Sequence, residues 1–123
     1  MTERARAILV VEDDVDVREA LATLLETQGY RVLEAENGLE ALGRLRDADF
    51  DVCLILLDLF MPVMNGWTFR EEQLRDPTMA AVPVVVVTAD VSARRSGKDL
   101  RAEEYLTKPV DFDHLLAVVA RHC

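Results

Sequence analysis

Five short runs of β-branched and aliphatic residues recur along the chain, and each is followed by a stretch that could form a helix. The runs cover residues 7–11, 31–35, 52–57, 84–88 and 104–107. The first, third and fourth are apolar throughout, which is typical of parallel strands that are covered on both faces. This alternation predicts an α/β fold in which a five-stranded parallel sheet is wound on both sides with helices.

The intervening stretches carry helical signals of unequal strength. Residues 15–28 have a clear apolar stripe, with Asp14 or Asp16 as a candidate N-cap and Gly29 as a stop. Segments 66–75 and 91–100 have weaker patterns, and they are predicted as helices mainly because parallel strands need crossover connections. The prediction is therefore five helices. The two other stripes consist of Leu39, Leu42 and Leu45, and of Phe112, Leu115, Leu116 and Val119, where Asp111 can cap.

Length, charge and cysteine usage narrow the functional class. The chain has 123 residues and a formal net charge of −9, so we expect one domain over residues 1–123 with no effector domain and no direct contact with nucleic acid. The longest apolar stretches fall well short of the ~20 residues that cross a bilayer. No signal peptide is evident at the start, which predicts a cytoplasmic protein without membrane insertion. Cys53 and Cys123 form no CxxC pair and are predicted to be unpaired thiols.

Polar residues stand where four of the predicted strands end, and ligands of such sheets bind at that edge. Glu12 and Asp13 follow the first run, Asp58 follows the third, Thr88 closes the fourth, and Lys108 follows the fifth. Three converging carboxylates repel one another, and a hard divalent cation such as Mg²⁺ relieves that repulsion. A carboxylate, a metal, an ammonium group and a hydroxyl together suit phosphoryl transfer to Asp58.

Four motifs, in order, resemble the receiver domains of bacterial two-component response regulators, in particular stand-alone regulators of the chemotaxis type. The resemblance covers the whole chain and implies the flavodoxin-like strand order 2-1-3-4-5. The motifs are Ile-Leu-Val-Val-Glu-Asp-Asp at 8–14, Leu-Asp-Leu-Phe-Met-Pro-Val-Met-Asn-Gly at 57–66, Val-Val-Thr-Ala at 86–89 and Tyr-Leu-Thr-Lys-Pro at 105–109.

The same resemblance implies a role for each matched residue. Asp58 is expected to be the phosphoacceptor, and Lys108 and Thr88 are expected to contact the phosphoryl group. Mg²⁺ would be bound directly by Asp13 and Asp58 and by the backbone carbonyl of Phe60, with Glu12 acting through a metal-bound water. Tyr105 is either a half-buried strand aromatic or a switch that moves with Thr88. The Lys108–Pro109 peptide bond is expected to be cis.

A receiver of this type takes its phosphoryl group from a phosphohistidine on a sensor histidine kinase or a histidine phosphotransfer protein. It then signals through a changed surface to a downstream protein, and it catalyses only its own phosphotransfer and autodephosphorylation. One alternative is a Mg²⁺-dependent phosphatase with an aspartyl nucleophile, but such enzymes need a second Asp where this chain has Phe60. A pseudo-receiver that never takes phosphate is the other alternative, and the complete set of site residues argues against it.

Overall fold

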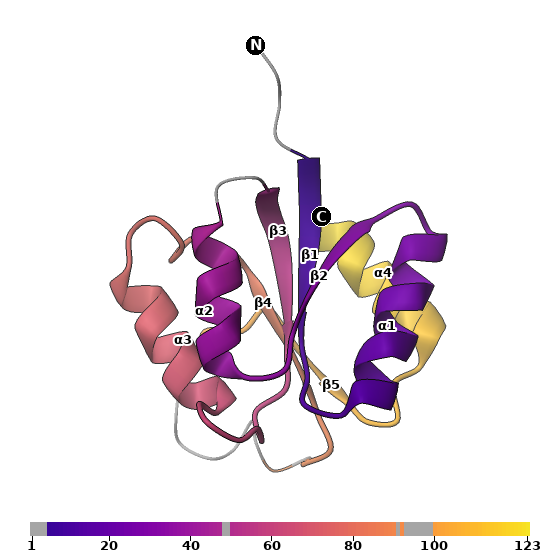
Figure 1. Cartoon of the computed structure of the whole chain (residues 1–123). Helices are drawn as coiled ribbons and strands as arrows, with labels where there is room; N and C mark the ends of the chain where they lie inside the picture. The colour runs from indigo at the N-terminus through magenta and orange to yellow at the C-terminus, as the bar shows by residue number, and fades with distance from the viewer. Residues whose placement is uncertain (1–4, 48–49, 91, 93–99) are drawn as a thin grey trace.

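The computed structural model describes residues 5–47, 50–90, 92 and 100–123, and its centre is a parallel sheet (Figure 1). The strands lie in the order β2-β1-β3-β4-β5, which confirms the expected order. All pairings between neighbouring strands are parallel. The strands are β1 (Ala5–Val11), β2 (Arg31–Ala35), β3 (Phe50–Leu57), β4 (Val84–Thr88) and β5 (Glu104–Thr107).

Four helices are described, and each begins after a side chain that caps it. Asp14, not Asp16, is the N-cap of the first helix, because its carboxylate accepts hydrogen bonds from the backbone N–H groups of residues 16 and 17. The predicted helix over 91–100 lies outside the described residues, apart from residues 92 and 100. The described helices are α1 (Val15–Thr27), α2 (Gly38–Arg46), α3 (Gly66–Arg75) and α4 (Phe112–His122).

The helices cover both faces of the sheet, with α2 and α3 on one side and α1 and α4 on the other (Figure 1). Strand β1 shows why an uninterrupted apolar strand is needed here: Leu9 and Val11 belong to the core under α2 and α3, whereas Ile8 and Val10 belong to the core under α1 and α4. None of the described helices combines the length and apolar character that crossing a lipid bilayer requires.

Two residues of the predicted apolar stripes do not join either core. The side chains of Leu39 and Phe112 are 56% and 49% exposed. Both residues lie in the first turn of their helices, α2 and α4, close to the carboxyl edge of the sheet, where little of the sheet remains to cover them. Helical periodicity alone cannot show where along a helix its supporting sheet ends.

Strand β3 contains an irregularity that redirects one side chain. Ala7 pairs with Val52 and the next residue of β1, Ile8, pairs with Leu54, so Cys53 is an extra residue in β3. As a result Cys53 and Leu54 both face the core under α1 and α4, although successive strand residues normally face opposite sides.

The prediction of unpaired thiols was wrong, because Cys53 forms a disulfide with Cys123. Helix α4 runs back along the sheet, so its carboxyl end arrives beside the first half of β3, and the two Cα atoms lie 5.3 Å apart. This proximity depends on the packing of α4 and on the extra residue in β3. A sequence separation of 70 residues gave no indication of it.

A buried polar pair on α3 was also missing from the sequence analysis. The Arg70 guanidinium donates hydrogen bonds to the backbone oxygens of Leu100 (2.8 Å) and Arg101 (3.0 Å) and to Gln73 Oε1 (2.7 Å). Gln73 in turn donates to the backbone oxygens of Met79 and of residue 82. These contacts fasten α3 to the chain segments that precede β4 and β5.

Candidate functional site

The predicted site residues meet at the carboxyl edge of the sheet. Carboxylate oxygens of Glu12, Asp13 and Asp58 lie within 4.8 Å of one another. Glu12 and Asp58 are 3% and 6% exposed, whereas Asp13 is exposed. Hydrogen bonding that continues one residue past the strands fixes this convergence, because the Asp58 N–H donates to the Val11 carbonyl at 3.0 Å.

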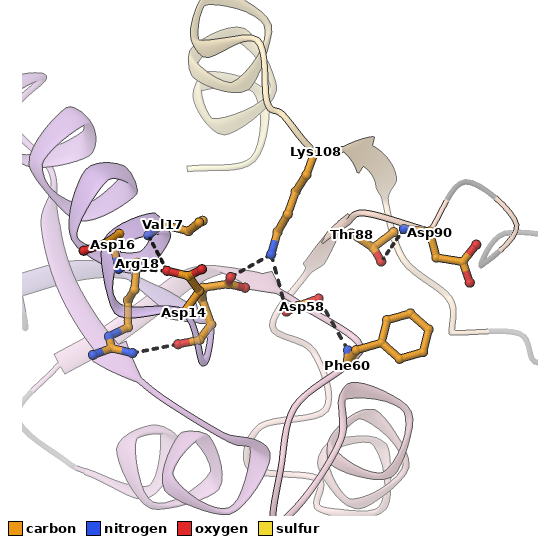
Figure 2. A network of polar contacts seen from close by, with 10 residues as sticks. Asp14, Asp16, Val17, Arg18, Asp58, Phe60, Thr88, Asp90 and Lys108 are labelled. Atoms are coloured by element: carbon orange, nitrogen blue, oxygen red, sulfur yellow. Dashed lines mark hydrogen bonds and ion pairs between the residues drawn. The ribbon is translucent and has the colours of Figure 1, made fainter.

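Lys108 reaches into this acidic cluster from the end of β5 (Figure 2). Its Nζ atom donates to Glu12 Oε1 at 2.7 Å and to Asp58 Oδ2 at 3.4 Å. The backbone N–H of Lys108 donates to the Thr88 carbonyl at 2.9 Å, which extends the β4–β5 pairing to the base of the lysine side chain. The Lys108–Pro109 peptide bond is cis, as expected.

The close carboxylates change the protonation behaviour of Glu12. Burial, together with a hydrogen bond to the Asp58 carboxylate, raises the pKa of Glu12 to about 7, although Lys108 opposes the shift. Burial alone would lower the pKa of Lys108, but its hydrogen bond to Glu12 and the neighbouring negative charges raise it. Without a bound cation, therefore, Glu12 keeps its proton up to about neutral pH while Lys108 stays charged.

The loop after Asp58 is packed too tightly for a side chain at Gly66. A Cβ atom at Gly66 would lie 2.5 Å from the Asp58 carbonyl oxygen and 2.8 Å from the Cα atom of Leu59. The Gly66 N–H also donates to the Leu59 carbonyl at 3.0 Å. A glycine at the first residue of α3 thus lets this helix press directly against the backbone that carries Asp58.

The Phe60 ring lies 5.1 Å from the Trp67 ring in an edge-to-face arrangement. Phe60 is 52% exposed, and its backbone N–H donates to Asp58 Oδ1 at 3.4 Å. Trp67 is half-buried and packs against the core under α2 and α3. The indole is therefore two contacts away from the Asp58 carboxylate, through the ring and backbone of Phe60.

Thr88 and Asp90 lie on the side of Asp58 away from Asp14 and Arg18 (Figure 2). Thr88 is 3% exposed, and its hydroxyl accepts a hydrogen bond from the Asp90 N–H at 3.2 Å. Tyr105 is half-buried in β5 and packs against the core under α2 and α3. This position agrees with a strand aromatic, and the switch role of Tyr105 stays a prediction.

Arg18 is a supporting residue that the sequence analysis missed. From α1 it donates to the backbone oxygen of Glu12 at 2.8 Å (Figure 2) and to the Glu34 carboxylate at 3.2 Å. The guanidinium thus holds the chain that carries Glu12 beside β2. A basic residue one turn into an amphipathic helix gives no sequence signal for such a contact.

The donor atoms of the cluster fit Mg²⁺, since they are closely spaced carboxylate oxygens, which hard divalent cations prefer. The sequence model of the response regulator receiver domain matches residues 8–120. The chain belongs to the response regulator receiver domain family. It is a phosphoacceptor domain of two-component signalling, and Mg²⁺ is its cofactor.

Relatives of the receiver domain include proteins of similar length and proteins of about twice its length. It is 36% identical to Protein PilH of Pseudomonas aeruginosa over 114 residues, 91% of this chain and 93% of PilH. It is 34% identical to the DNA-binding dual master transcriptional regulator RpaA of Synechocystis over 91% of this chain, but only 46% of RpaA. The chain thus spans about half the length of RpaA and of several other relatives.

Solved structures that resemble this chain also include response regulators. The chemotaxis protein CheY4 of Vibrio cholerae superposes with a TM-score of 0.84 at 29% identity, covering 98% of this chain and 100% of that one. The response regulator TrrA of Thermotoga maritima, in complex with Mg²⁺-BeF, has a TM-score of 0.84 at 31% identity, with coverages of 97% and 99%.

Proposed function

We propose that Asp58 is the phosphoacceptor of this receiver domain, and that Lys108 and Thr88 contact the transferred group. The observation that carries the proposal is the buried Asp58 carboxylate at the centre of a cluster with two further acids and an ammonium group 3.4 Å away. A lone carboxylate this deeply buried would be costly, whereas a nucleophile in a preorganised charged pocket is not.

In the proposed reaction an Asp58 oxygen attacks the phosphorus of a phosphohistidine. A P–O bond forms, the P–N bond breaks, and the donor imidazole keeps the electron pair. The ammonium group of Lys108 balances negative charge on the phosphoryl oxygens, and the Thr88 hydroxyl donates a hydrogen bond to one of them once transfer is complete. Transfer also requires Lys108 to exchange part of its contact with Glu12 for the incoming group.

The metal site uses the same cluster. Asp13, Asp58 and the backbone carbonyl of Phe60 would hold Mg²⁺ directly, and Glu12 would act through a metal-bound water. When bound, the cation supplies positive charge that offsets the negative charge of the carboxylates and of the phosphoryl oxygens. Glu12 would release its proton when the cation binds, because the nearby positive charge would stabilise the ionised carboxylate against the burial that raises its pKa.

As a signalling partner, the domain would take phosphate from a sensor histidine kinase or a histidine phosphotransfer protein and pass the signal to a downstream protein. We propose that residues 1–123 act as a single cytoplasmic receiver domain. It would catalyse only its own phosphotransfer and autodephosphorylation. The exposed aromatic Phe60 supports this last point, because an aspartyl-nucleophile phosphatase would need a general acid at that position.

Incubation with acetyl phosphate and Mg²⁺, followed by intact-mass measurement, tests the proposal. One added phosphoryl group is expected in the wild type and none in Asp58→Asn, which keeps the shape but lacks a nucleophile. Asp14→Asn is a matched control beside the site, because Asn caps α1 as well as Asp and labelling should persist. Labelling of Asp58→Asn would refute the assignment. Sustained consumption of acetyl phosphate without an adduct would indicate the phosphatase, and no reaction would indicate a pseudo-receiver.

A further inference from the structure

A pair of cysteines lies far from the acidic cluster, at the opposite part of β3. Cys53 is five residues before Asp58 in the strand, which corresponds to about 16 Å. Cys123 is the C-cap of α4, and its backbone N–H donates to the Val119 carbonyl at 2.9 Å. Both cysteines are half-buried, so a small thiol reagent can reach them without unfolding the core.

Two features show that the pairing is built into the fold. The extra residue in β3 turns Cys53 towards α4, where its neighbours in the core include Cys123. In addition, Cys53 Sγ lies 3.4 Å from the Ala7 carbonyl oxygen, which can accept a hydrogen bond from a free thiol. Cys53 therefore has a suitable partner in the oxidised state and another in the reduced state.

The disulfide acts where other contacts of α4 are weakest. The middle of the helix is held by Leu115, Val118 and Val119, which are fully buried. The last turn is held to β5 by two contacts with the Glu104 carboxylate, from Arg121 at 3.6 Å, with the Arg121 side chain 58% exposed, and from His122 Nε2 at 3.5 Å. Such exposed ion pairs contribute little to stability. The covalent bond to β3 is thus a major constraint on the last turn of α4.

We propose that Cys53 and Cys123 form a reversible redox site that clamps the last turn of α4 onto β3. The oxidant is a small-molecule disulfide of the glutathione type. One cysteine thiolate attacks this disulfide and releases one small thiolate, and the second cysteine then attacks the mixed disulfide and releases the other. The two protein thiols together lose two electrons and two protons, and the reagent is reduced to two thiols. The surface formed by the end of α4 and by Glu104 then responds to thiol redox state.

Thiol trapping of the wild-type protein tests the pair itself. The protein is equilibrated in reduced and oxidised glutathione buffers, alkylated, and weighed intact. We expect two alkylated thiols in reducing buffer and none in oxidising buffer, with the chain remaining monomeric. The proposal is overturned if both thiols stay reactive in oxidising buffer, if glutathione adducts accumulate in place of the internal bond, or if chains become cross-linked.

Hydrogen exchange in the two buffers tests the clamp. Amides in the last turn of α4 should exchange at least about tenfold more slowly in the oxidised protein, whereas amides in α1 should change much less. Cys53→Ala and Cys123→Ala are matched controls, since neither can form the bond, and both should exchange equally in the two buffers. Equal exchange of this turn in oxidised and reduced wild-type protein would show that the bond does not clamp the helix.

Discussion

Lowering the pH from 8 to 6 should weaken Mg²⁺ binding by about tenfold, because Glu12 then holds a proton that the cation must displace. Burial and the hydrogen bond to Asp58 raise the pKa of Glu12 to about 7 in the metal-free protein. For a pKa of about 7, about ten elevenths of Glu12 is ionised at pH 8 and about one eleventh at pH 6. The ratio of these fractions sets the expected change in the apparent dissociation constant.

The raised pKa of Glu12 also determines whether the free energy of unfolding of the metal-free protein rises or falls with pH. Glu12 keeps its proton in the folded protein up to about pH 7, whereas in the unfolded chain it loses the proton near the ordinary glutamate pKa of 4.5. The folded state thus binds more protons between these values, and the free energy of unfolding should fall as pH rises through that window. The difference of about 2.5 pKa units limits the loss to about 3 kcal/mol. Saturating Mg²⁺ should remove most of this slope.

Titration of Mg²⁺ against Trp67 fluorescence provides the assay, since the indole contacts the Phe60 ring and Phe60 contacts Asp58. Glu12→Gln is the control, because an amide occupies similar space but does not titrate in this range. The variant should bind Mg²⁺ with a much weaker pH dependence than the wild type. Equal affinities of the wild type at pH 6 and pH 8, or an unchanged tenfold dependence in Glu12→Gln, would refute the reasoning.

Three further substitutions test other parts of the structure. Gly66→Ala should lower the free energy of unfolding by more than about 3 kcal/mol in urea titrations, because its Cβ would overlap backbone, whereas Gly43→Ala has open space and should stabilise α2 by up to about 1 kcal/mol; similar values for the two would contradict the packing described. Arg70→Lys should cost about 2–3 kcal/mol by thermal or urea unfolding, because a lysine ammonium lacks the planar fork with which the guanidinium reaches acceptors on different chain segments; a loss below about 0.5 kcal/mol would show that these bonds are replaceable. Phe60→Asn should speed loss of the Asp58 phosphate about tenfold, since the aromatic ring excludes water from that rim. Asp90→Ala should change the decay less, because the Asp90 carboxylate is held by the backbone and hydroxyl of residue 92; an unchanged rate in Phe60→Asn would mean that the ring does not shield the phosphoryl group.

Much of the fold follows from local sequence patterns. The starts and ends of β2, β4 and β5 coincide with the predicted runs, and Asp111 caps α4 as expected. These features depend on residues close together in the chain, such as a cap and the first turn that it serves, so a single sequence contains the information. The strand order, by contrast, came from the resemblance to receiver domains, because apolar runs do not identify their neighbours.

The composition of the acidic site was also readable from the sequence. Strands of a parallel sheet end at one edge, so Glu12, Asp58 and Lys108 were expected at the same edge, and the strand order implied by the resemblance brought them close together. Their protonation was not readable, since the pKa of Glu12 depends on its burial and on the orientation of the Asp58 carboxylate. Which residues form the site thus follows from the order of the strands, whereas the charge states of these residues depend on their positions in the folded protein.

The remaining features were decided only by tertiary packing. The Cys53–Cys123 bond requires an extra residue in β3 and the return of α4 along the sheet. The buried Arg70 looks like a surface residue in the sequence, and its partners at residues 100 and 101 lie about thirty positions further on. Sequence periodicity describes which face of a helix or strand is apolar. The disulfide and the Arg70 hydrogen bonds depend instead on where two distant elements end and how their side chains meet. These positions are determined only when the whole chain packs.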